Sequence, residues 1–492
     1  MSAGLSLGAI GLVVLATVVV GVHGLRISRT TDDFLVASRT VRTWWNASAI
    51  SGEYLSAATF LGLTGLVLLD GTDAFWFPIG YCGGYLLLLV FVAAPLRRSG
   101  ARTIPAFLAA RLDSPAARRV TTLLVVVIGW LYIVPQLHGA AITVNVVTGL
   151  PPWLGAAGVA LVVGVIVAAG GMRSITFVQA FHYWLKLTAM GVPVVLLLIA
   201  AGGHESAGAG AELFPVNAGP SGQDPLRTAS LMLALLLGTM GLPHVLVRFY
   251  TNPDGGSARR TTLVVIALIS VFYMLSSTMG LLARMVAPDL AEPGVADSAL
   301  LLLPARLLPG PAGEVVTAII IAGAFAAFIS TSSGLVVSLA GSVSEDLLGG
   351  GVRAFRIAAL GCAIVPVGFA LVSVPGGLTS SVGLVFLVAA SSMSPVLLLG
   401  VWWRRLTARG AIAAMLVGAA SSIGAVALDA SGLLGDLVLL EQPALWTVPL
   451  ATAVAVIVSR LDQRGPPSGA HRRLLRLHAP ERRLTADEQP TP

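Results

Sequence analysis

The segment Ala326-Ala327-Phe328-Ile329-Ser330-Thr331-Ser332-Ser333-Gly334 places four consecutive hydroxyl side chains inside an apolar run from about 315 to 340. That run is long enough to cross a bilayer as a helix. Ala327, Ser330 and Thr331 stand at positions i, i+3 and i+4, so one helical face offers two hydroxyls and a backbone carbonyl to one point. A hard cation prefers such oxygen ligands. A tightly packed helix whose hydroxyls bond to carbonyls one turn back is the alternative interpretation.

The composition around this segment is that of a polytopic membrane protein. Of 492 residues, 56% are hydrophobic and only 11% are charged, whereas about a quarter of a soluble domain is charged. Two cysteines provide no disulfide or zinc framework. The sequence contains no phosphate loop, nucleophile elbow or metal-ligand cluster, so we expect no enzyme and no resident cofactor. The net charge of +7 comes from arginines in short loops, which indicates membrane orientation and no nucleic-acid partner.

Hydrophobic runs predict an all-α protein with about thirteen transmembrane spans. The expected spans are residues 4–24, 45–69, 74–95, 120–147, 151–170, 175–201, 228–250, 261–287, 314–340, 355–374, 379–402, 410–429 and 442–460. The loops richest in arginine follow the first, third and eleventh spans, and such loops face the cytoplasm. We therefore expect the N-terminus outside, the C-terminus inside, a membrane domain over 1–462 and a disordered cytoplasmic tail over 463–492.

Two of these spans contain helix-breaking sequences. Ser51-Gly52-Glu53 interrupts the second span, and Gly238-Thr239-Met240-Gly241-Leu242-Pro243-His244 interrupts the seventh. Freed backbone groups at membrane depth are tolerated only where they are buried in protein or line a cavity. Breaks five spans apart indicate an inverted-repeat transporter, with repeats at about 45–201 and 228–402. The first span would then be peripheral, and the last two, about 410–460, would be additions. Ordinary glycine packing is the alternative.

The chain also resembles the sodium/solute symporter family and, within it, the cation/acetate (monocarboxylate) symporters. The segments that carry the resemblance are 52–62, Gly170-Gly171-Met172 with Val178-Gln179, 238–249 and Ser344-Glu345-Asp346-Leu347. The resemblance extends from about residue 30 to 430. It implies a LeuT-like core of two inverted five-helix repeats with extra helices at both ends.

This resemblance also implies a cation site. In similar symporters a sodium ion lies between the first helix of repeat one and the third helix of repeat two. The matching positions imply ligands from the carbonyls of Gly52, Leu55 and Ala327 and from the hydroxyls of Ser330 and Thr331. Sodium would be a co-transported ligand. Some relatives have Asp where this chain has Gln179, so a second cation at that carboxylate is not implied.

Polar, aromatic and break-forming residues within or beside the spans are candidates for solute binding or coupling, because a buried ionisable group is costly to keep without a role. The candidates are Glu53, Tyr54, Ser56, Thr59, Trp76, Gln136, Gln179, His182, Lys186, Met240, Gly241 and His244. The spacing of Gln179, His182 and Lys186 places the three on one helical face.

Several of these candidates have more than one interpretation. Glu53 and Lys186, the only lysine in the chain, either form an ion pair or act separately, with Lys186 attracting an anionic solute. His244 and Arg248 either cap a helix end or contact the solute. Aromatic residues such as Trp76 either line a small apolar pocket or anchor span ends at the membrane interface.

Together these features predict a secondary active transporter in the plasma (inner) membrane of a bacterium. It would import acetate or a similar short monocarboxylate with sodium, protons being a further candidate cation. Its expected partners are a sodium ion, a small monocarboxylate anion and the lipid bilayer, and the sequence does not indicate an oligomeric state. The alternatives are a sodium symporter of a neutral solute and a sensor that binds its solute without transport. A channel is disfavoured because two broken helices suit alternating access better than a pore.

Overall fold

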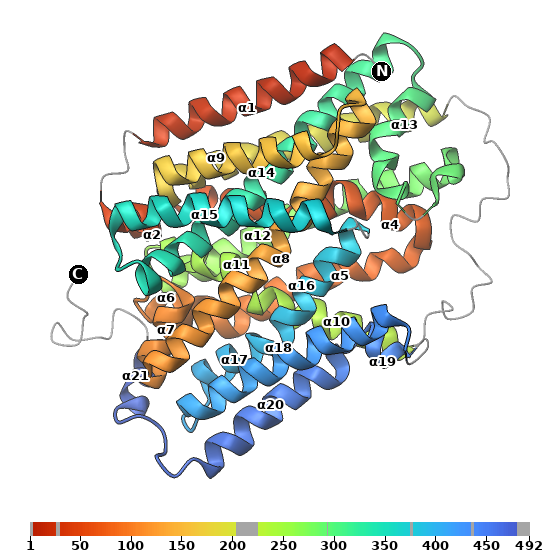
Figure 1. Ribbon diagram of the computed structural model, residues 1–492. Helices are drawn as coiled ribbons and strands as arrows, with labels where there is room; N and C mark the ends of the chain where they lie inside the picture. Colours follow the sequence, from red (N-terminus) through yellow and green to blue (C-terminus); the bar gives the residue numbers. More distant parts are fainter. Residues whose placement is uncertain are drawn as a thin grey trace.

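The computed structural model describes residues 3–25, 30–202, 225–292, 294–373, 377–433 and 437–479, and every regular element in them is a helix (Figure 1). The α-helices are α1 (Ala3–Leu25), α2 (Thr31–Val36), α3 (Thr43–Tyr54), α4 (Leu63–Asp70), α5 (Trp76–Leu87), α6 (Ala93–Arg98), α7 (Ile104–Leu112), α8 (Pro115–Thr148), α9 (Trp153–Gly202), α10 (Pro225–Gly241), α11 (Pro243–Val247), α12 (Gly255–Val286), α13 (Ala299–Leu307), α14 (Pro311–Leu347), α15 (Gly351–Val372), α16 (Leu378–Ser392), α17 (Ser394–Trp402), α18 (Ala408–Ser431), α19 (Val438–Glu441), α20 (Ala444–Leu461) and α21 (Ala470–His478). Helices satisfy their backbone hydrogen bonds internally, as a bilayer requires.

By length and composition, ten helical stretches in the described residues can cross a membrane, or eleven if the bent pair formed by α10 and Pro243–Thr251 is counted. Trp153–Gly202 covers nearly all of two predicted spans, and Ala58–Arg98 contains the third predicted span together with the second part of the second one. Trp153–Gly202 is interrupted at Gly171, whose φ of 57° is not helical. The count of about thirteen spans therefore stays a prediction.

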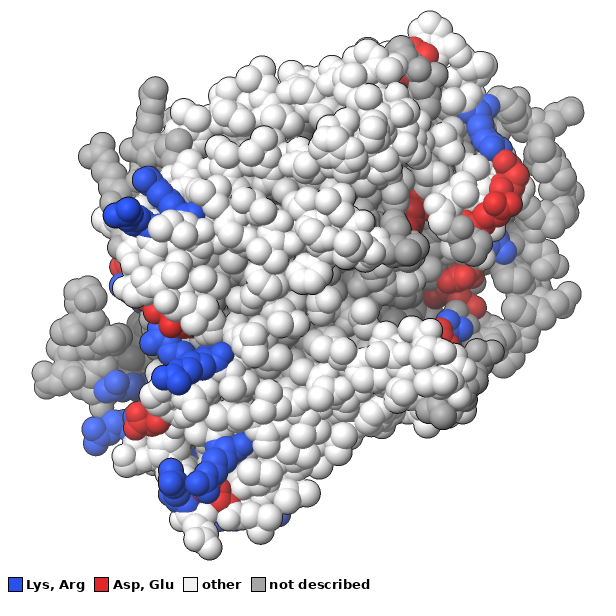
Figure 2. Space-filling view, in the orientation of Figure 1, with Lys and Arg blue, Asp and Glu red and all other residues white. Residues whose placement is uncertain are grey.

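Charged side chains gather at two ends of the molecule, and a nearly uncharged surface separates them (Figure 2). Basic side chains predominate at the end where α2, α7 and α21 lie, and acidic side chains predominate at the opposite end, where α1 begins (Figures 1 and 2). Positively charged ends of membrane proteins face the cytoplasm. This distribution is the one expected for an external N-terminus, and the orientation stays a prediction.

Both spans with a predicted break are interrupted, but the first interruption is displaced from its predicted position, because Ser51, Gly52 and Glu53 are helical. Helix α3 ends at Tyr54, Leu55 is extended with φ −73° and ψ 91°, and helical structure resumes at Ala58. Helix α10 ends at Gly241, the extended Leu242 follows, and α11 begins at Pro243 with a bend of 41°. The first interruption lies in the interior of the protein, where α3, α9 and α14 pack against one another, and the second lies against Ala389 and Ser394 of α16 and α17.

The added helices lie at the margins of this core. Helix α1 packs against α9 and α14, while α18 and α20 pack against each other and against α16. In Figure 1, α1 runs along the top and α20 along the bottom, with the interrupted helices between them. Helices α1, α18 and α20 therefore lie outside the core that contains the interrupted helices.

Part of the expected disordered tail is helical. Residues 470–478 form α21, which contacts α6, α7 and α17, and residues 480–492 lie outside the described residues. Leu474 and Leu477 are buried because their spacing places both on the side that faces the protein. Arg98 donates to the carbonyl oxygens of Leu477 and His478 at 3.4 and 3.3 Å, which satisfies backbone groups at the helix end. The disorder expected for 463–492 is therefore wrong for this segment.

Candidate cation and solute site

Close contacts between helices bring the candidate residues together. A Cβ atom added to Gly52 on α3 would lie 2.1 Å from the carbonyl oxygen of Gln179 on α9. A Cβ atom added to Gly334 on α14 would lie 2.1 Å from Cδ of Glu53. Both distances are far below van der Waals contact, so the absence of a side chain at these two positions allows α9 and α14 to approach the interrupted end of α3.

Three of the oxygen ligands expected for the cation surround a lysine side chain. The Lys186 ammonium group, on α9, donates to the Gly52 carbonyl, to the Leu55 carbonyl at 2.7 Å and to the Ser330 hydroxyl at 2.9 Å. The Ser330 hydroxyl is 2.7 Å from the Gly52 carbonyl oxygen and 3.2 Å from that of Ala327. We refer to the oxygen atoms of Gly52, Leu55, Ala327 and Ser330 as the oxygen cradle.

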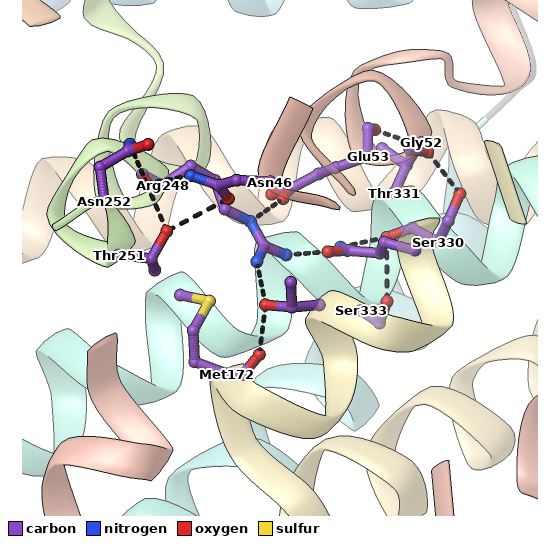
Figure 3. A network of polar contacts seen from close by, with 12 residues as sticks. Asn46, Gly52, Glu53, Met172, Arg248, Thr251, Asn252, Ser330, Thr331 and Ser333 are labelled. Atoms are coloured by element: carbon purple, nitrogen blue, oxygen red, sulfur yellow. Dashed lines mark hydrogen bonds and ion pairs between the residues drawn. The ribbon is translucent and has the colours of Figure 1, made fainter. Parts of the chain in front are cut away.

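Thr331, the remaining expected ligand, has a different partner. Its hydroxyl donates to the Glu53 carbonyl at 2.6 Å and so joins α14 to α3 beside the cradle (Figure 3). The two neighbouring hydroxyls of α14 therefore bond to two consecutive carbonyls of α3, Ser330 to Gly52 and Thr331 to Glu53. This arrangement combines the two interpretations of the segment, because the hydroxyls both pack the helices and lie at the expected cation position.

Glu53 forms an ion pair with Arg248 and not with Lys186. Arg248 Nε lies 2.6 Å from Glu53 Oε2, and the two side chains are 1% and 2% exposed. The guanidinium also donates to Thr176 Oγ1 at 2.9 Å and to the Gln179 side-chain oxygen. The interpretation of Arg248 as a helix-capping cation near the surface is wrong, because the turn after α11 directs this side chain into the protein.

Gln179 connects the Glu53–Arg248 ion pair to α14 beside the oxygen cradle, and His182 contacts neither. The Gln179 amide donates to the Ser330 carbonyl at 3.0 Å while its oxygen accepts from Arg248. His182 Nε2 instead lies 2.8 Å from Thr17 Oγ1 on α1. The shared helical face expected for Gln179, His182 and Lys186 is therefore divided, because the peripheral helix α1 covers part of it.

The solute candidates lie mostly around the two helix breaks. The Tyr54 hydroxyl is 3.0 Å from Thr239 Oγ1 on α10, and Gln136 Oε1 accepts from the Ala57 N–H at 2.8 Å. The candidates that are buried beside the breaks also include Ser56, Thr59, Met240, Gly241 and His244. Trp76 differs from them because it is 38% exposed, which favours its interpretation as an interfacial anchor.

Several buried polar atoms near the breaks have no hydrogen-bond partner among the described residues. They are Glu53 Oε1, Ser56 Oγ, the hydroxyl oxygens of Tyr81 and Tyr85, and both ring nitrogens of His244. An unpartnered buried polar group costs about 1–3 kcal/mol. These atoms are therefore candidates to bind a solute or water.

Aromatic rings hold these unpartnered groups close together. The ring of Tyr54 lies 4.7 Å from that of Tyr85, Tyr132 lies 5.1 Å from His244, and Phe386 lies 4.9 Å from Tyr81 and 6.1 Å from Tyr132. Tyr85, Tyr132 and Phe386 were not among the candidates from sequence. A phenol hydroxyl within an apolar span was the available signal for the two tyrosines.

This architecture defines the class of protein. Two interrupted membrane helices that meet at a buried polar site are characteristic of secondary transporters. A family model for the sodium:solute symporter family matches residues 34–418, and the chain belongs to that family. It is a multi-span membrane transporter and not an enzyme, and the family uses sodium as a co-substrate and not as a resident cofactor.

Known proteins agree with this assignment. The chain is 30% identical over 464 residues to the uncharacterized symporter YwcA of Bacillus subtilis, with 88% of this chain and 90% of that protein covered. It is also 30% identical over 479 residues to a monocarboxylic acid transporter of Corynebacterium glutamicum, with 87% and 86% covered.

Solved structures show the same fold. A Na⁺-coupled sialic acid symporter in a substrate-bound outward-open state matches with a TM-score of 0.77 at 17% identity, covering 94% of this chain and 99% of that chain. Mhp1, a nucleobase-cation-symport-1 family transporter in a closed conformation, matches with a TM-score of 0.59 at 13% identity, covering 90% and 98%. These neighbours have the LeuT-like architecture expected from the sequence.

Proposed function

We propose that this chain is a symporter of the bacterial plasma membrane that imports acetate or a similarly short monocarboxylate by alternating access. The observation that carries the proposal is the charge of the buried groups at the helix breaks. Arg248 and Lys186 contribute two positive charges, whereas Glu53 contributes one negative charge. The excess positive charge complements an anionic solute and disfavours a neutral one.

The remaining groups suit a small carboxylate. The unpartnered hydroxyl of Ser56 and the ring nitrogens of His244 are of the type that donates hydrogen bonds to a carboxylate. The Tyr54, Tyr85 and Phe386 rings provide apolar surface for a short acyl chain. The monocarboxylic acid transporter of Corynebacterium glutamicum supports the same solute class.

Coupling to a cation follows from family membership, and sodium is the cation that it implies. We propose the carbonyls of Gly52, Leu55 and Ala327 and the hydroxyls of Ser330 and Thr331 as its ligands, at the helix break that also lines the solute site. A cation that favours one arrangement of this break raises the affinity for the solute, and the solute raises the affinity for the cation by the same factor.

Uptake of labelled acetate into proteoliposomes with an imposed inward sodium gradient tests this function. We expect labelled acetate to accumulate. Unlabelled propionate or pyruvate should reduce this accumulation, and proline should leave it unchanged. Accumulation of a neutral solute without competition by acetate would assign the chain to the neutral-solute symporters. Binding of acetate without counterflow of preloaded label would indicate a sensor.

A further inference from the structure

Lys186 is a fully buried cation without a carboxylate partner. It is 0% exposed, and in the part of the chain that the structure describes its ammonium group makes no ion pair with an acidic side chain within 4.0 Å. The buried carboxylate nearest in the network, Glu53, is engaged by Arg248 at 2.6 Å. Glu53 therefore attracts the Lys186 charge only through space, and the groups that bond directly to the ammonium group are dipoles.

Those dipoles are the oxygen atoms of the cradle. An ammonium group has three N–H donors, and the carbonyls of Gly52 and Leu55 with the Ser330 hydroxyl provide three acceptors. Two of these acceptors are available because α3 is interrupted after Tyr54. The helix break and the α14 hydroxyl thus form a complete set of ligands for one positive charge, and the lysine occupies its centre.

A sodium ion at the same position would need the same oxygen lone pairs. It would also lie within a few ångströms of the Lys186 charge in a buried region, where repulsion between like charges is strong. Because the Glu53–Arg248 pair is neutral overall, a sodium ion added beside an undisplaced Lys186 would leave two uncompensated positive charges. The cradle therefore accommodates one cation at a time.

We propose that the Lys186 ammonium group is a built-in competitor of sodium at the oxygen cradle, so that a sodium ion binds there only when this side chain withdraws. The proposal deepens the proposed function, since it concerns the cation step of the same site. It makes Lys186 a determinant of cation affinity. The position of the lysine on α9 then links cation entry to a movement of its side chain away from the interrupted end of α3.

Sodium binding to the purified protein tests this idea without any assumption about the solute. Binding of ²²Na⁺, and the rise in melting temperature on adding sodium at constant ionic strength with choline, are measured for wild type and Lys186→Ala. We expect the apparent sodium dissociation constant to fall at least about tenfold in Lys186→Ala, because the variant removes both the competing charge and its bulk. Lys186→Gln, which removes the charge and keeps most of the bulk, should show a smaller gain and serves if the alanine variant does not fold.

Two further variants locate the effect. Met190→Ala shortens another buried side chain one turn along α9 and should leave sodium affinity as in wild type, which controls for looser packing. Ser330→Ala combined with Lys186→Ala should abolish the gain, because it removes a ligand of the cradle. Weaker or unchanged sodium binding in the folded Lys186 variants would overturn the proposal, and so would a gain that persists after Ser330→Ala. Failure of acetate uptake alone would contradict the proposed function and leave this result standing.

Discussion

Removing either partner of the buried Glu53–Arg248 pair should destabilise the protein strongly. Removing both should cost less than the sum of the two single losses. Glu53→Gln leaves the Arg248 guanidinium, 1% exposed, without its counter-charge, and Arg248→Gln does the same to the carboxylate, which is 2% exposed. A buried charge cannot recover its hydration, so each single substitution should cost about 3–5 kcal/mol. At about 1.4 kcal/mol per factor of ten, the ratio of folded to unfolded protein falls by roughly a hundredfold to a few thousandfold.

The double variant separates the ion pair from the other contacts of the arginine. Arg248 also donates to Thr176 Oγ1 at 2.9 Å and to Gln179, and these bonds are lost in every variant that lacks the arginine. They therefore cancel in a double-mutant cycle. We expect Glu53→Gln/Arg248→Gln to be less destabilised than the sum of the single variants by roughly 2–3 kcal/mol.

Equilibrium unfolding in mixed micelles, followed by tryptophan fluorescence, measures these differences. A second cycle with Glu53→Gln and Lys186→Gln is the comparison, because Lys186 is bonded to the cradle and interacts with the carboxylate only through space. Its interaction free energy should be smaller than that of the first cycle, because the two side chains share no hydrogen bond. Additive losses in the first cycle, or stronger coupling in the second cycle, would refute the assignment of Arg248 as the partner of Glu53.

Two further substitutions examine helix contacts by thermal unfolding in detergent. Gly334→Ala should destabilise the protein by about 1–3 kcal/mol, because its Cβ would lie 2.1 Å from Glu53 Cδ. Gly341→Ala on the same helix, with its nearest neighbour atom at 3.4 Å, should change stability by less than about 1 kcal/mol, and equal effects would contradict this reasoning. Asp346→Ala should cost about 1–3 kcal/mol, because this 2% exposed carboxylate accepts from Arg118 at 2.5 Å, and an unchanged melting temperature would show that the contact adds no stability.

The break after Gly241 and the position of the hydroxyl pair were predictable because their signals are local, whereas the chain leaves α3 after Tyr54 and not at the predicted Ser51-Gly52-Glu53. The Gly241-Leu242-Pro243 sequence favours a helix break, although single Gly or Pro residues such as Gly52 and Pro135 lie inside helices. The spacing of Ser330 and Thr331 determines which helical face carries them. The partners of the charged residues were not predictable in this way. Arg248 lies beyond the end of α11, and only the direction of the following turn places its side chain against Glu53.

The position of Lys186 shows a second limit of sequence reasoning. Its acceptors are mainly backbone carbonyls, and the orientation of a carbonyl depends on how the chain leaves a helix and not on which side chain it carries. His182 shows a third limit. Its spacing from Gln179 is that of a common helical face, but its side chain is bonded to Thr17 of α1. Sequence periodicity describes one helix at a time, whereas these contacts depend on where separate helices pack.

The hydrogen bond between the Ala57 N–H and Gln136 Oε1 has a consequence for solute affinity. At 2.8 Å, it gives α8 a side chain that satisfies a backbone group freed by the interruption of α3. This contact within the protein therefore stabilises the interrupted conformation. Ordering a flexible backbone costs about 1–2 kcal/mol per residue. Because folding has already met that cost for the unwound residues, an incoming solute meets a preorganised site, and its binding free energy is not reduced by the unwinding of a helix.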